Sequence, residues 1–94
     1  MLMVAATVLF PVPTAPHAHA ANGEFRYHHA YTRLHVTLRN PSEGTCIQAT
    51  NLGCVRNLTN RAVTLYPSPA CQGEPLGTLE PGQSQALAFG SITF

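Results

Sequence analysis

Two short segments of this 94-residue chain, EFRYHH and LHVTLR, constrain its fold more strongly than any other part of the sequence. Apolar and polar side chains alternate along both, which is typical of strands with one buried face. If the segments form a hairpin in which paired residue numbers sum to 63, one face becomes apolar and the other polar. The apolar pairs are then Phe25–Leu38, Tyr27–Val36 and His29–Leu34, and the polar pairs are Glu24–Arg39 and His28–His35. A slip of one residue would turn the apolar set toward water, so we predict this hairpin in this register.

The remaining sequence also favours strands over helices. Short runs of Thr, Val, Leu and Phe alternate with Gly, Pro, Asn and Ser, and no window keeps helical spacing for more than a turn. The segment EPGQS at 80–84 predicts a turn, with Pro81 fixing φ and Gly82 supplying a positive φ. Further strands are predicted at Thr45–Ala49, Val55–Leu58, Val63–Tyr66, Gly77–Leu79, Gln85–Phe89 and Ile92–Phe94. About seven or eight short strands predict an all-β sandwich or barrel.

The N-terminus has the pattern of a secretory signal peptide. An apolar run at Leu2–Phe10 leads into proline-rich sequence and then Ala18-His19-Ala20. Small residues at the third and first positions before the cut are what signal peptidase accepts, which favours cleavage after Ala20. The alternative is a membrane anchor, but about nine to twelve apolar residues are too few for a ~30 Å hydrocarbon core. We therefore predict a signal peptide at 1–20 and a single secreted β-domain at 21–94, without membrane attachment after cleavage.

This prediction also decides a metal question. His17 and His19 are one residue apart and could form half of a metal site. Because they precede the predicted cleavage site, they leave with the signal peptide. No metal ligand is expected from them.

Three cysteines remain in the predicted mature chain. The spacings of Cys46, Cys54 and Cys71 match neither a redox motif nor a zinc pattern, so one disulfide with one cysteine left over is the simplest arrangement. Loop-closure entropy gives ~3.5 kcal/mol for Cys46–Cys71 against ~2.6 for Cys46–Cys54, which does not decide the pairing. We favour Cys46–Cys71 because both lie near predicted strand ends. Cys54 is then a buried thiol or a link to a second chain, and a catalytic thiolate is disfavoured because no helix N-terminus or basic cluster is evident beside it.

Charge and motifs exclude several functions. Five arginines and four glutamates give a net charge of +1, which supplies neither the basic face needed for nucleic acid nor a polybasic membrane anchor. The His28–His35 pair could hold Zn²⁺ or Cu²⁺, but its neighbours Arg26 and Thr37 add no ligand, so we predict a solvated polar face. No G-x-S-x-G motif, phosphate-binding glycine loop or aspartate is present, and neither an enzyme nor a cofactor is expected. Asn57-Leu58-Thr59 matches the N-glycosylation acceptor pattern.

Two sets of motifs carry a family resemblance. The segment VTLYPSPACQGEPLGTLEPGQSQALAFGSITF, residues 63–94, resembles one Greek-key unit of the βγ-crystallin superfamily. The resemblance depends on the aromatic strand VTLY, the turn ending in CQG, and Ser91 at the start of the closing strand. Nearly all of residues 22–94 also resembles a group of small exported bacterial proteins of unknown function, with an early G-x-F-x-Y, a P-S-x-G-x-C-I turn and an N-x-T-[DN] step. The resemblance implies a Greek-key fold and, through similar secreted peptidase inhibitors, a binding role. It implies no calcium site, because Phe89-Gly90 stands in place of the required amide or acidic pair.

These features lead to two functional hypotheses. The first is a secreted, disulfide-stabilised binding domain of unknown protein target, with peptidase inhibition as its specific form. Its predicted contact loop comprises Tyr66, Pro67, Ser68, Pro69, Gln72, Gly73 and Glu74. Two prolines and a disulfide would rigidify this loop and reduce the entropy lost on binding. The second hypothesis is a structural or envelope-associated extracellular protein that dimerises through Cys54, whereas the first is compatible with a monomer.

Overall fold

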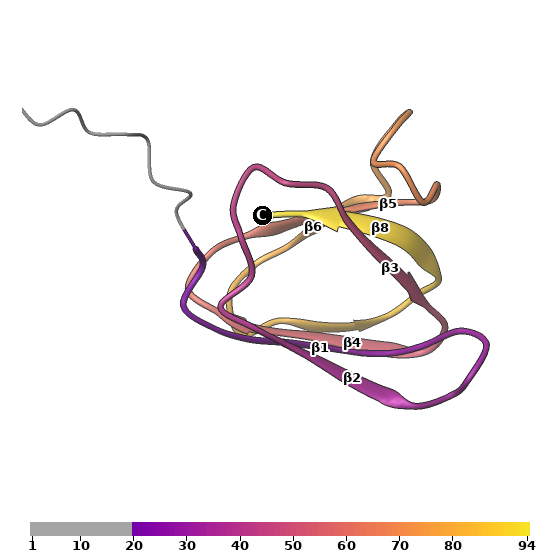
Figure 1. Cartoon of the computed structure of the whole chain (residues 1–94), viewed down its shortest axis with the longest axis horizontal. Coiled ribbons are helices and arrows are strands. Elements are labelled where there is room, and N and C mark those ends of the chain that lie inside the picture. Colours follow the sequence, from indigo (N-terminus) through magenta and orange to yellow (C-terminus); the bar gives the residue numbers. More distant parts are fainter. Residues whose placement is uncertain (1–19) are drawn as a thin grey trace, which may run out of the picture.

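The computed structural model describes residues 20–94, which form eight β-strands and no helix (Figure 1). The predicted signal peptide lies outside the described residues except for Ala20, and so do His17 and His19. The strands are β1 (Gly23–His28), β2 (His35–Arg39), β3 (Ile47–Asn51), β4 (Cys54–Thr59), β5 (Val63–Tyr66), β6 (Gly77–Leu79), β7 (Ser84–Ala86) and β8 (Phe89–Thr93).

The strands form two four-stranded antiparallel sheets, ordered β2-β1-β4-β7 and β3-β8-β5-β6. Of the first four strands, β1, β2 and β4 lie in the first sheet and β3 lies in the second. The last four strands do the reverse, because β7 lies in the first sheet. Figure 1 shows β1, β2 and β4 in the lower layer and β5, β6 and β8 in the upper one. The all-β prediction is confirmed, with two sheets packed as a sandwich.

The first hairpin forms in the predicted register. All five β1–β2 pairs from Glu24–Arg39 to His28–His35 match the expected ones. The expectation that Leu34 would join the apolar face is wrong, since Leu34 is 65% exposed. Arg33, with φ of 61°, reverses the chain just before it, and Leu34 precedes β2. The alternation that directs Val36 and Leu38 inward therefore does not extend to Leu34.

The core lies between the sheets and is centred on Phe25. This side chain is fully buried, and its ring lies 5.5 Å from Phe94, 6.2 Å from Tyr27 and 6.4 Å from Phe89 between centroids. Such edge and tilted contacts add to the stabilisation from burial. The buried apolar cluster consists of Phe25, Tyr27, Ala49, Val55, Val63, Leu65, Leu79, Phe89 and Ile92.

The predicted ends of the last strands are wrong. We expected Gln85–Phe89 and Ile92–Phe94, with residues 90 and 91 between them, whereas β7 is Ser84–Ala86 and β8 runs continuously over Phe89–Thr93. Gly90 lies within β8, and a neighbouring loop lies directly against its backbone there. Glycine inside a strand often marks such a close approach. The expected turn is present, with Gly82 at φ 85° and the Gln83 amide donating to the Glu80 carbonyl.

Two buried asparagines join the sheets. Asn51 in β3 accepts from the His28 amide of β1 at 2.9 Å and donates to the Leu87 carbonyl at 2.7 Å. Asn57 in β4 is fully buried and donates to the Leu79 carbonyl of β6 at 3.0 Å. Because the Asn57 amide is enclosed, the Asn57-Leu58-Thr59 motif has a structural role and is not an accessible glycan acceptor in the folded chain.

Candidate functional site

The predicted contact loop, Tyr66–Glu74, connects β5 to the segment before β6 and is called the cystine loop below. Figure 1 shows it in orange, rising away from the two sheets beside β5. Most of its side chains are exposed, and only Tyr66, Ser68 and Cys71 are half-buried. The residues predicted to contact a partner are therefore brought together on one projecting segment.

A disulfide fixes the loop to the second sheet. Cys71 bonds Cys46, which lies directly before β3, with 5.9 Å between the Cα atoms. This is the pairing favoured from the sequence. The backbone of Cys71 has a φ of 53° and that of Gly73 a φ of 81°, so the chain turns sharply on both sides of Gln72. A left-handed conformation at a cysteine requires support from its surroundings.

Ser91 supplies that support from β8. Its fully buried hydroxyl accepts from the Cys71 amide at 2.8 Å and donates to the Ser68 carbonyl. The Ser68 hydroxyl in turn pairs with the backbone of Gln72, whose amide donates to it at 3.2 Å. The backbone of the cystine loop is thus held by a covalent bond, by a buried side chain and by its own hydrogen bonds.

The loop offers shape more than reactivity. Pro67, Pro69, Gln72 and Glu74 are exposed, and Glu74 is the one carboxylate among the nine residues. The Ser68 hydroxyl in the loop is occupied by its hydrogen bonds with the Gln72 backbone. A rigid, exposed backbone with two prolines is suited to binding, because little freedom is lost when a partner docks.

Gly90 sets how closely the loop can lie on β8. A Cβ atom added there would lie 2.8 Å from the Pro67 carbonyl oxygen and 2.8 Å from the Ser68 carbonyl carbon. We expect Gly90→Ala to lower the free energy of unfolding by about 1–3 kcal/mol, because the backbone of the cystine loop has to move away from β8 to admit the methyl group. Denaturant unfolding followed by circular dichroism measures this. Ala88→Ser, which adds one atom at an exposed position, is the control, and equal stability of the two variants would contradict the prediction.

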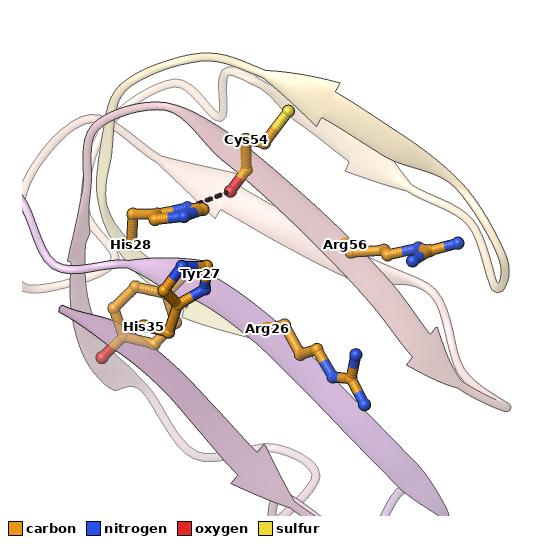
Figure 2. Close-up of a pocket in the computed structure, with 6 residues that line it drawn as sticks. All are labelled: Arg26, Tyr27, His28, His35, Cys54 and Arg56. Atoms are coloured by element: carbon orange, nitrogen blue, oxygen red, sulfur yellow. Dashed lines mark hydrogen bonds between the residues drawn. The ribbon is translucent and has the colours of Figure 1, made fainter. Parts of the chain in front are cut away.

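A second cluster lies on the outer face of the first sheet. A cavity of about 220 Å³ is lined by Arg26, Tyr27, His28, His35, Cys54 and Arg56, and is called the cationic pocket below. Figure 2 shows the guanidinium groups of Arg26 and Arg56 at one end and the imidazoles of His28 and His35 at the other. This pocket could not be predicted from the sequence, because it depends on the pairing of β1 with β4, whose segments are far apart in the chain.

The histidine pair in this pocket has the predicted position. The His28 and His35 ring centroids are 4.1 Å apart. The Nδ1 atom of His28 lies 3.1 Å from the Cys54 carbonyl, which can only accept, so Nδ1 carries the proton. Figure 2 shows the Cys54 sulfur pointing away from His28. Among residues 20–94, no group of three or more His, Cys, Asp or Glu side chains could hold a metal ion.

Cys54 is free and exposed. The expectation of a buried thiol is therefore wrong. In β4 the side chains alternate between the two faces, and Cys54 falls on the outer face with Arg56, while Val55 and Asn57 point into the core. The alternative reading, a link to a second chain, requires this exposure.

The one carboxylate on this face is held by two arginines. Glu24 contacts Arg26 at 2.6 Å and Arg39 at 2.8 Å. The hydrogen bond from Arg26 is the largest cause that holds the pKa of Glu24 below its ordinary value of 4.5; the positive charge of Arg39 adds to it, and desolvation opposes both.

This shift predicts an acid dependence of stability. A carboxyl group whose pKa is lower in the folded state stabilises the fold above pH 4.5, and this stabilisation is lost as the pH falls through the folded value. We expect Glu24→Gln to melt below the wild type at neutral pH and the difference to shrink once the pH falls below 4.5. Melting temperatures across this range test it, with Glu74→Gln in the exposed loop as control. A difference that stays constant into strong acid would refute the assignment.

Comparisons with known proteins return no family model, no curated protein and no solved structure that matches this chain. Within the described residues no helix has the length and apolar character needed to span a membrane.

Proposed function

We propose that this chain is a secreted, disulfide-stabilised domain that acts by binding a protein partner through the cystine loop, and that an extracellular peptidase is the partner. The observation that carries the proposal is the loop itself. Its backbone is anchored to β3 by the disulfide and to β8 by Ser91, while Pro67, Pro69 and Gln72 remain exposed. Prior ordering of this kind leaves more of the contact energy available as affinity.

Export is the cellular setting of this proposal. A disulfide persists in an oxidising compartment, which fits removal of residues 1–20 during secretion. Intact mass of the exported protein, with and without thiol alkylation, tests this directly. We expect a chain beginning at Ala21 with one disulfide and one thiol that reacts without reduction. Native material that begins at Met1 with three free thiols would overturn it.

We also propose a relationship to the βγ-crystallin superfamily. Two features support it beyond the sequence motifs. In each run of four strands the third strand, β3 or β7, lies in the opposite sheet from the other three, and Ser91 forms hydrogen bonds with the backbone of the cystine loop in the same run. In a Greek key the fourth strand returns to lie beside the first, as β4 does beside β1 and β8 beside β5.

Peptidase inhibition can be tested with a panel of secreted serine, cysteine, aspartic and metallopeptidases. We expect the domain to slow at least one of them, and the double variant Gln72→Ala/Glu74→Ala to weaken inhibition at least about tenfold by removing exposed polar contacts. Thr37→Ala, an exposed change in β2 on the other sheet, is the matched control. If none of the peptidases is slowed, the inhibitory function is excluded.

A second function is favoured by one observation, the exposure of Cys54. An exposed thiol in an oxidising compartment can join two copies of the chain, as a structural or envelope-associated protein would require. Non-reducing electrophoresis of the exported protein distinguishes the two functions. A dimer that collapses with reductant and is absent in Cys54→Ser supports this second function, whereas a monomer with a reactive thiol opposes it.

A further inference from the structure

Positive charge is concentrated on one face of the sandwich. The four strands of the first sheet contain Arg26, Arg39 and Arg56, three of the five arginines of the chain, and all three are exposed. Glu24 is the single acidic residue in these strands. The net charge of +1 for the whole chain therefore conceals a cationic outer face.

Two of these arginines are direct neighbours. Arg26 in β1 is paired with Arg56 in β4. Like charges directly opposite each other in a sheet are destabilising unless an anion lies between them. Glu24 serves Arg26 and Arg39, but no carboxylate within the described part of the chain forms a salt bridge with Arg56. The position beside Arg56 thus lacks the negative charge that the pair needs.

We propose that the cationic pocket binds a tetrahedral oxyanion, phosphate or sulfate, with Arg56 as its principal ligand and Arg26 as the second. The planar guanidinium group presents paired N–H donors that match the oxygen atoms of such an anion. The anion lies between the two arginines and offsets their mutual repulsion. This site is on the sheet opposite to the one that carries the cystine loop, so it is independent of the peptidase proposal.

The pocket has room for more than a bare ion. Its volume of about 220 Å³ is larger than the roughly 150 Å³ of an engineered protein cavity that accommodates benzene. His28 and His35 line the end away from the guanidinium groups, where they can contact the organic group of a phosphate or sulfate ester. The same oxyanion chemistry therefore has two sources, a free inorganic ion and an ester.

Nuclear magnetic resonance titration of the full exported chain tests the proposal. The probes are inorganic phosphate, inorganic sulfate and phenyl phosphate, with chloride at matched ionic strength as the reference, and the histidine ring protons report binding. We expect saturable shifts at His28 and His35. Tighter binding of phenyl phosphate than of phosphate identifies an ester as the ligand, and the reverse order identifies the free ion. Shifts no larger than those with chloride for all three probes would overturn the site.

Three variants make the test specific. Arg56→Gln is expected to weaken binding at least about tenfold, because it removes the principal charge-assisted donor. Glu24→Gln is expected to tighten binding, because it removes the competing carboxylate and frees Arg26. Arg61→Gln, which removes an exposed arginine outside this sheet that contacts Glu43 at 3.4 Å, should leave binding unchanged. Equal loss in Arg56→Gln and Arg61→Gln would show nonspecific charge attraction and overturn the proposal. A cooperative melting transition above the titration temperature verifies that each variant is folded, including Glu24→Gln, which is expected to melt below the wild type.

Discussion

Replacing Cys46 and Cys71 together by serine is expected to lower the free energy of unfolding by about 3 kcal/mol. The disulfide joins residues separated by 25 positions, and closing a loop of that length removes about 3.5 kcal/mol of chain entropy from the unfolded state. A domain of this size has a total stability of roughly 5–15 kcal/mol, so the loss is a large fraction of it. Unfolding in urea followed by circular dichroism measures the change, because the chain has no tryptophan to report by fluorescence.

The same variant should affect the cystine loop more than the rest of the fold. Without the disulfide, the left-handed backbone at residue 71 is held by Ser91 and by the hydrogen bond between Ser68 and Gln72, and hydrogen exchange at the amide of residue 71 is expected to accelerate. Cys54→Ser, compared as a reduced monomer, is the matched control, because it removes an exposed sulfur and breaks no disulfide within the chain. If the double variant and the control unfold at the same urea concentration, the disulfide does not stabilise this domain as argued.

The parts that could be predicted from the sequence are those in which a local pattern has one solution. The β1–β2 hairpin is an example, because its strands are separated by a short loop and one register alone satisfies both faces. The cystine pairing was favoured from its position near strand ends. In both cases the prediction depends on the residues of the segments themselves and does not require knowing which other segments pack against them.

The exchange of β3 and β7 between sheets could not be predicted in the same way. Strands of three to five residues contain too little alternation to select a partner, and the β4–β7 and β3–β8 pairs join segments distant in the chain. The pairing of Arg26 with Arg56, and with it the cationic pocket, depends on such a contact. For the same reason the predicted strands left Gly90 out, since its neighbour, the cystine loop, is close only in the folded chain.

Buried asparagines are the least predictable part of the interior. In sequence Asn57 is a polar residue in an acceptor-like motif, and nothing local indicates that four hydrogen bonds converge on it. In the fold its amide nitrogen donates to the carbonyls of Arg61 at 2.7 Å and Leu79 at 3.0 Å. Its side-chain oxygen accepts from the Thr59 amide at 3.0 Å and from the Thr59 hydroxyl at 2.7 Å. This one side chain therefore satisfies backbone groups of β4, of the β4–β5 connection and of β6.

Replacing Asn57 by alanine is accordingly expected to cost at least about 3 kcal/mol of stability. The Leu79 carbonyl and the Thr59 amide would each lose this partner, and a buried group left unpaired costs about 1–3 kcal/mol. The missing amide also leaves a void next to the core. The Arg61 carbonyl suffers less, because the Thr59 hydroxyl also lies 3.0 Å from it and can donate to it. Urea unfolding of the variant measures the loss.

Two further variants separate the contributions. Asn57→Asp keeps the acceptor for Thr59 but has no N–H for the carbonyls of Arg61 and Leu79. Its loss of stability therefore measures the hydrogen bond between the sheets together with the penalty of a buried charge. Asn60→Ala removes an exposed amide whose oxygen accepts from the Asn22 amide at 2.8 Å, and we expect it to cost no more than about 1 kcal/mol. If Asn57→Ala is no more destabilising than Asn60→Ala, burial of the Asn57 amide does not join the sheets energetically, and the sandwich depends on its apolar core, its disulfide and the hydrogen bonds of Asn51.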